Sequence, residues 1–425
     1  MVNRMGRSRS EGRSASWAAK LAFVWGGELV SVLTSSVLQM GFVWHITLTT
    51  NSASMLSLAS LAGFLPLALF GTFAGTIVDR LPLKRTLVGA DLFIAAVSAA
   101  VAVVSLTGTL PVWVIMVALF VRAIGSSFHT PAFQALTPLV APAEHLTRLA
   151  GVTQAVQSGG YILGTAIAAV IYPLWGLTAM IALDVAGALI ATAAVLAARL
   201  NVGGAGQGTQ AGEKDLGLAA QARALAAETA DGYRVLRGYR GLFALLWCGF
   251  AFTLVFSPIS ALFPLMTLDH FGGTTGDAAT AEIVFSVGMI AGSALLTATG
   301  GLKNRALTVV AATALYGVAT LAAGLLDAGG FVAFLAMSFL MGLSSPFYSG
   351  PQTALMQEKV PPEYLGRVFG LYGAIMSWAL PLGLAFSSVF ADAVGAPAWF
   401  VGAGAAMVLL AGVTWSIPAI RRIEE

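Results

Sequence analysis

Long apolar runs alternate with short polar stretches along the whole chain. A run of about 20 apolar residues is long enough for a helix to cross roughly 30 Å of hydrocarbon. An isolated strand in lipid would leave its backbone groups without hydrogen bonds, so each run is expected to be helical. The pattern predicts an all-α membrane protein with 12 transmembrane helices, whose cores lie near residues 18–43, 55–78, 86–106, 112–130, 149–171, 177–198, 242–266, 281–300, 306–326, 331–350, 367–390 and 398–418.

The composition supports this class and excludes others. The chain is 58% hydrophobic and 10% charged, with a mean hydropathy of +0.86. Soluble domains are about 45 to 50% apolar, so one large soluble core is excluded. The single cysteine, Cys248, rules out a disulfide framework. Because the sequence has no P-loop motif, catalytic triad or histidine pair with metal-ligand spacing, we expect no enzyme, cofactor or metal site, and an ion gradient as the energy source.

The basic residues lie on one side of the predicted helices. Of the 22 Lys and Arg residues, 21 fall near the two ends of the chain or in the even-numbered connections, and the exception is Arg122 in the fourth apolar run. The positive-inside rule therefore predicts a multi-pass protein of the cytoplasmic (inner) membrane with both termini in the cytoplasm. Since topology accounts for this charge, the net charge of +3 indicates no nucleic-acid partner.

The two halves of the chain echo each other. Gln134, Glu144, Arg148 and Gly151 recur 218 or 219 residues later as Gln352, Glu363, Arg367 and Gly370, and Gly71 and Gly75 recur 217 residues later as Gly288 and Gly292. Such a repeat is typical of transporters built from two pseudo-symmetric six-helix bundles. We expect a disordered basic cytoplasmic tail over 1–16, bundles over 17–199 and 241–420, a cytoplasmic linker with a surface helix over 200–240, and a second tail over 421–425.

Three motifs carry a resemblance to a known family. Each matches a signature of the major facilitator superfamily. The loop 2-3 signature matches GTIVDRLPLKR at 75–85, the helix 4 signature matches Arg122 with Gly125, and the helix 5 signature matches Gly151, Gly160 and Gly164. The chain resembles this superfamily from about residue 17 to 420. Pro82 replaces the usual glycine of the first motif, and Thr165 with Ala168-Ala169 departs from the antiporter form of the third. PAFQALTPLVAPAEHL and DGYRVLRGYRGLFALL are similar to the macrolide-efflux branch of drug:proton antiporters, which also includes siderophore exporters.

The first motif is interpreted as a conformational latch that ties the half-domains together in one state. Gly71 and Gly75 lie four residues apart on one helix face and permit close helix approach. Asp79 can accept hydrogen bonds or pair with a base, and Arg80, Lys84 and Arg85 can bridge to partner helices or lipid headgroups. The alternative is a solvated loop, which explains Lys84 and Arg85 well. Asp91 either supports the latch or pairs locally.

Ionisable residues inside the apolar runs are the candidates for proton coupling, because a charge at membrane depth is costly and usually functional. Glu28 is the first choice for the proton carrier, against a structural, hydrogen-bonded role. Asp184 is the second choice. Arg122 cannot deprotonate, so it needs a counter-charge and is expected either to assist proton release or to act structurally.

The substrate is expected to be an amphipathic small molecule, because the membrane interior offers one arginine and few carboxyls. A subset of aromatic and methionine residues could line its cavity: Trp25, Met40, Phe252, Phe256, Tyr348 and Trp378. The leading hypothesis is a monomeric exporter of a drug-like, macrolide-like or siderophore-like compound, working by proton antiport and alternating access in the lipid bilayer. An importer or uniporter of a small solute with the same fold, and a non-transport role such as lipid scrambling, are the alternatives.

Overall fold

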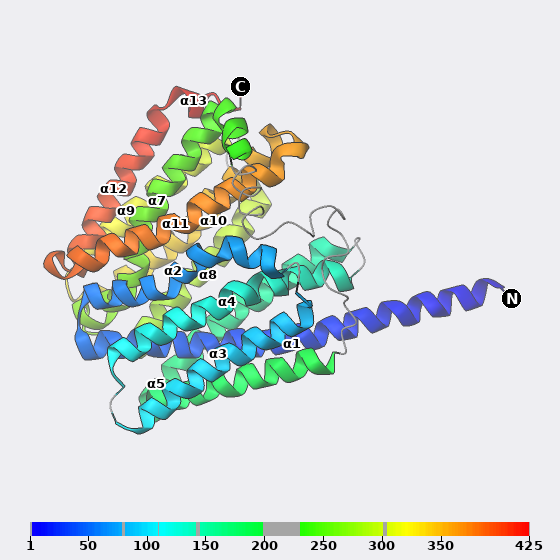
Figure 1. The fold of residues 1–425 in the computed structure, drawn as a ribbon. Coiled ribbons are helices and arrows are strands. Elements are labelled where there is room, and N and C mark those ends of the chain that lie inside the picture. Colours follow the sequence, from blue (N-terminus) through cyan, green and yellow to red (C-terminus); the bar gives the residue numbers. More distant parts are fainter. Residues whose placement is uncertain are drawn as a thin grey trace. The chain divides into compact units, whose positions relative to one another are not determined.

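The computed structural model describes residues 2–78, 81–108, 110–141, 145–198, 230–300 and 304–424. These residues are helical apart from short turns and connections, so the predicted all-α class is confirmed. Among them, 11 helices are long and apolar enough to cross a membrane. The protein is therefore a multi-pass membrane protein, and Figure 1 shows the order of its helices.

The first half of the chain forms α1 to α5, at Val2–Thr50, Ala53–Val78, Leu83–Leu106, Val112–Val140 and Leu146–Ala197. The helix α5 covers two of the predicted segments. At Gly176 its backbone leaves the helical region, with φ 69° and ψ −173°, three residues after Pro173. A positive φ is accessible to glycine at little cost, so the chain reverses there, and each part of α5 is long enough for one crossing.

The second half forms α7 (Arg240–Leu265), the short π-helix η3 (Met266–His270), α8 (Thr275–Thr299), α9 (Arg305–Gly324), α10 (Phe331–Lys359), α11 (Pro362–Val394), α12 (Ala396–Ser416) and α13 (Pro418–Arg421). Local sequence signals fix several ends. A capping box between Thr274 and Asp277 opens α8, and Gly300, at φ 70°, ends it. Residues 230–238 are also helical and fall in the segment expected to hold a surface helix. Residues 200–229 of the expected linker lie outside the described residues.

The chain divides into two compact units. Unit 1 contains Met1–His45 and Ala62–Gln210, and unit 2 contains Ile46–Leu61 and Ala211–Glu425. In unit 1, α3 packs against α4 and α5. In unit 2, α9 packs against α10 and α12, α8 against α10, and α7 against α11 and α12. The domain limits given above, including the tails, stay predictions.

Glycines set the closest helix contacts within each unit. A Cβ at Gly160 would lie 2.8 Å from a methyl of Val32 on α1, and one at Gly164 would lie 2.6 Å from the Leu33 carbonyl oxygen. In unit 2, Gly288 and Gly292 of α8 lie against the α10 backbone at Phe339 and Leu343. Two of the three helix 5 motif glycines therefore bring α5 onto α1, a use of small residues that is common in membranes.

Candidate functional site

A cluster of one histidine, two buried carboxylates and an amide joins four helices of unit 1. His129 of α4 has its Nε2 atom 3.2 Å from Oδ1 of Asp91 on α3 and 3.7 Å from Oε2 of Glu28 on α1. The amide of Gln157, on α5, donates a hydrogen bond of 3.0 Å to Oε1 of Glu28. The Glu28 and Asp91 side chains are 7% and 6% exposed, and that of His129 is 14% exposed. We call this set the Glu28 layer.

The Glu28 layer contains three groups whose side chains can bind or release a proton. One imidazole nitrogen of His129 faces both carboxylates. When any of these three groups gains or loses a proton, the electrostatic interaction between the imidazole and the carboxylates changes. With both carboxylates ionised and the imidazole neutral the layer carries two negative charges, and protonation of the imidazole leaves one. Such linked groups can take up a proton and pass on its effect as a movement of helices.

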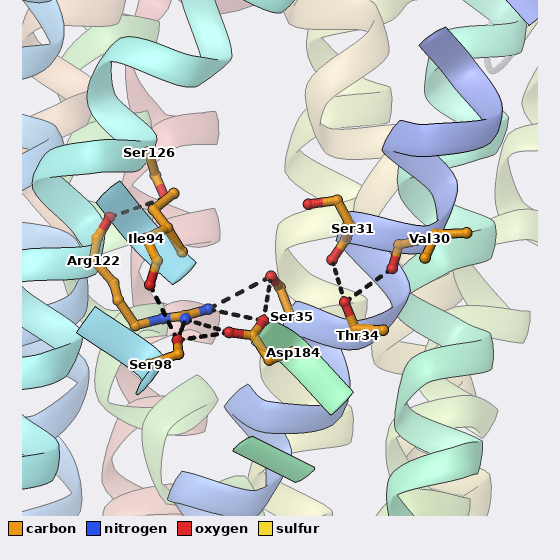
Figure 2. Close-up of polar contacts among 9 residues, drawn as sticks. All are labelled: Val30, Ser31, Thr34, Ser35, Ile94, Ser98, Arg122, Ser126 and Asp184. Atoms are coloured by element: carbon orange, nitrogen blue, oxygen red, sulfur yellow. Dashed lines mark hydrogen bonds and ion pairs between the residues drawn. The ribbon is translucent and has the colours of Figure 1, made fainter. Parts of the chain in front are cut away.

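A second polar cluster in unit 1 surrounds Asp184 (Figure 2). The Arg122 guanidinium contacts both oxygens of Asp184, with Nη2 3.2 Å from Oδ1 and Nη1 bonded to Oδ2. The hydroxyls of Ser35 and Ser98 donate to the same two oxygens, at 2.9 Å and 2.7 Å. Arg122 also donates to both hydroxyls. We call these four residues the Arg122 layer.

The Arg122 layer is built to hold charge in place. Asp184 is 1% exposed, and its two oxygens accept bonds from a planar guanidinium and two hydroxyls. A buried pair with this many hydrogen bonds offsets much of the cost of removing two charges from water. Asp184 is therefore a neutralised partner of Arg122, whereas Glu28 faces a titratable histidine.

The two layers are related by a spacing visible in the sequence. On three helices, the residue of one layer lies seven positions from the residue of the other: Glu28 and Ser35 on α1, Asp91 and Ser98 on α3, and His129 and Arg122 on α4. Seven residues are two helical turns, so each helix presents both layers on one face, about 10 Å apart along its axis. Sequence reasoning named Glu28, Asp91, Arg122 and Asp184 but missed His129, Gln157 and the two serines. The shared offset of seven is the signal that could have found His129.

The residues assigned to the latch are only partly described. Asp79 and Arg80 lie outside the described residues. The Lys84 ammonium donates a hydrogen bond of 3.4 Å to the Leu196 carbonyl oxygen, and Arg85 is exposed. Asp91 of α3 pairs with His129 of α4, and its expected role stays a prediction. A Cβ at Gly71, Gly75 or Gly151 meets no described atom within 4 Å. The latch itself stays a proposal.

Of the six residues proposed for a substrate cavity, three meet in unit 2. Phe252 stacks on Tyr348 and on Phe256, with ring centroids 4.5 Å and 6.2 Å apart. Trp25 packs into an apolar core with Leu87 and Phe133. Met40 is buried, and Trp378 is 40% exposed.

Comparisons with known proteins agree with this architecture. The family model described as "Major Facilitator Superfamily" matches residues 24–306. The chain is 44% identical to "Macrolide efflux protein A" of Streptococcus pyogenes over 408 residues, covering 96% of this chain and 98% of that protein. It is 46% identical to "Macrolide efflux protein A" of Enterococcus faecalis over 334 residues, covering 79% of this chain and 100% of that protein.

A solved structure, the peptide transporter POT in complex with sulfate, matches with a TM-score of 0.71 and 14% identity over 95% of both chains. At that identity the likeness concerns the fold alone. The family model and the two similar relatives carry the assignment of the family, and the expected resemblance to the macrolide-efflux branch is confirmed. The chain belongs to the major facilitator superfamily and is a transporter, not an enzyme.

Proposed function

We propose that this protein exports amphipathic small molecules, macrolides among them, across the cytoplasmic membrane in exchange for protons. Two relatives that match most of the chain are macrolide efflux proteins by name, which supports the direction and the substrate class. The one-sided basic residues support cytoplasmic termini. Alternating access by movement of the two bundles is the mode of transport that the repeat favours.

The observation that carries the antiport proposal is the Glu28 layer. Two carboxylates, Glu28 of α1 and Asp91 of α3, lie within 4 Å of the imidazole nitrogen of His129 on α4. The Arg122 layer, seven residues away, holds its carboxylate in an ion pair. We therefore assign proton binding to Glu28, with His129 and Asp91 as its partners. To Asp184 and Arg122 we assign the structural role of a charge-neutral ion pair.

Glu28→Gln tests this assignment in proteoliposomes. The amide keeps the size of the side chain but cannot release a proton, so a pH gradient should no longer drive accumulation of a radiolabelled macrolide such as erythromycin. Binding of the macrolide should persist and lose its dependence on pH. Glu363→Gln is a matched control, because Glu363 is exposed at the start of α11.

Two results would contradict the proposal. If Glu28→Gln accumulates macrolide at the wild-type rate and with the wild-type pH dependence, Glu28 is not the carrier. If wild-type protein moves macrolide equally well without a pH gradient and without any proton flux, the antiport assignment is wrong. Net uptake into vesicles only down a solute gradient would favour the importer or uniporter alternative.

A further inference from the structure

The short connection between α1 and α2 is held by hydrogen bonds to two carboxylates of unit 2. The Ser52 hydroxyl donates a hydrogen bond of 2.8 Å to Oδ2 of Asp392 on α11, and the Ser54 backbone N–H donates one of 3.0 Å to Oδ1. The Asn51 amide donates one of 2.8 Å to Oδ1 of Asp269 on η3. We call these five residues the Asp392 clip.

Asp392 caps a helix that lies more than 300 residues away in the sequence. Ser52 directly precedes α2, and its hydroxyl accepts a hydrogen bond of 3.1 Å from the Met55 backbone N–H. The N–H of Ser54, which has no partner within the helix, bonds to Asp392. The Asp392 backbone N–H donates in return to the Ser54 hydroxyl at 3.3 Å. Because a helix N-terminus attracts negative charge, the start of α2 is stabilised by a carboxylate of α11.

The clip acts on the ends of two helices at once. The segment Ile46–Leu61, which contains the end of α1, the start of α2 and their connection, belongs to unit 2, whereas the rest of both helices belongs to unit 1. The connection is two residues long, and Asn51 makes its turn with a φ of 46°. With so short a connection, a bond to either residue restrains both helices.

The helix α2 has a weak point next to this segment. Pro66 lies inside α2 and has no N–H, so the carbonyl oxygen of Ala62, four residues earlier, does not receive the usual helix hydrogen bond. Ala62 is also the first residue of α2 that belongs to unit 1. Helices bend most readily at such positions. The part of α2 that the clip holds therefore ends where the helix is easiest to bend.

We propose that the Asp392 clip locks the ends of α1 and α2 that face outward in the predicted orientation, and that it opens once in each transport cycle. Both of its carboxylates are exposed to solvent, so each hydrogen bond contributes modestly, which suits a contact that breaks repeatedly. This rests on the alternating access of the proposed function and names the contact that the outward-open state has to break.

Spin labels on the two sides of the clip measure its opening without any gradient. In a Cys248→Ser background, Leu58→Cys on α2 and Val389→Cys on α11 place labels at exposed positions about one turn from the clip. Double electron–electron resonance on purified protein in nanodiscs gives the populations of short and long distances. Asp392→Ala should raise the ratio of long to short distances about tenfold, and Asp269→Ala about threefold, because each variant loses hydrogen bonds to a charged group.

Asp327→Ala is the matched control. Asp327 is an exposed carboxylate between α9 and α10, on the same side of the membrane as the end of α11 in the predicted topology. Its replacement removes the same charge and should leave the ratio within twofold. Ser52→Ala should also open the clip but should add little to Asp392→Ala, because the two variants lose the same hydrogen bond. Thermal unfolding shows whether each variant is folded.

Three results would overturn the clip: an unchanged ratio in folded Asp392→Ala, an equal change in Asp327→Ala, or full additivity of Ser52→Ala and Asp392→Ala. If the ratio shifts as expected while wild-type protein fails to exchange macrolide for protons, the proposed function fails and the clip stands. If wild-type protein exchanges macrolide for protons while the ratio does not shift, the clip fails and the proposed function stands.

Discussion

At the scale of single residues, two buried carboxylates of unit 1 face different partners. Asp184 accepts bonds from Arg122, Ser35 and Ser98, whereas Glu28 faces His129 and accepts an amide hydrogen bond from Gln157. A guanidinium stays charged at every physiological pH, whereas an imidazole has both a neutral and a charged form. The carboxylate beside the imidazole is therefore the one to which we assign proton binding in the proposed function.

Replacing His129 tests the partnership directly. His129→Asn keeps a polar side chain beside Asp91 and Glu28 but removes the imidazole nitrogen that both carboxylates contact. We expect the rate of proton-driven export to fall at least tenfold, while macrolide affinity changes only a few-fold. Proton release on substrate binding, followed with a pH-sensitive dye, should also fall. Normal proton release by the folded variant would remove His129 from the mechanism.

The Arg122 layer makes a contrasting prediction about stability. Asp184→Asn strands a buried guanidinium, and breaking such a pair costs about 3 to 5 kcal/mol. Thermal unfolding in detergent should therefore occur at a clearly lower temperature. The double variant Arg122→Met with Asp184→Asn should recover much of the loss, because no unpaired charge remains. A double variant that is less stable than both single variants would show that the pair is not the source of the effect.

At the scale of helices, the glycines of α5 determine how closely it packs on α1. A Cβ at Gly164 would press on the Leu33 carbonyl oxygen and the Ser36 side chain, whereas one at Gly159 meets nothing within 4 Å. The glycines of the helix 5 motif differ in the same way, because Gly151, at its beginning, has no described neighbour that a Cβ would meet.

The two alanine substitutions should move stability in opposite directions. Gly164→Ala forces α1 and α5 apart and should lower the unfolding temperature. Gly159→Ala adds no clash and removes glycine flexibility from a helix, which stabilises by roughly 0.5 to 1 kcal/mol. The pair needs only one assay, thermal unfolding of both proteins side by side. Equal destabilisation by both would show that helix propensity, not the α1–α5 contact, is being measured.

The sequence predicts the helices well because membrane crossing requires long apolar runs, and those runs are local. It also marks Glu28, Asp91, Arg122 and Asp184, because each charge stands out in an apolar segment. It does not predict which of them meet. His129 near a predicted helix end and Gln157 in a glycine-rich stretch are unremarkable until α3, α4 and α5 pack around α1.

At the scale of the whole molecule, the distribution of basic residues makes a prediction about orientation. The chain has a single cysteine, so Cys248→Ser gives a background free of thiols. Thr107→Cys, between α3 and α4, should react with a membrane-impermeant maleimide in intact cells. Leu81→Cys, between α2 and α3, should react only after the cells are opened. The reverse pattern would place the termini outside and overturn the assignment by the positive-inside rule.

The ion pair of Arg122 with Asp184 also determines how the membrane potential acts on unit 1. Moving one elementary charge through a membrane potential of 100 mV involves about 2.3 kcal/mol, but a neutral pair moves without electrical work. A movement of the Arg122 layer along the membrane normal would therefore neither cost nor release electrical energy in an energised membrane. Asp184→Asn leaves a lone positive charge there, and its transport rate, normalised to folded protein, should become sensitive to a potassium diffusion potential set with valinomycin. The double variant with Arg122→Met should lose that sensitivity, whereas a voltage response equal to wild type in Asp184→Asn would mean that the layer stays fixed in the field throughout the cycle.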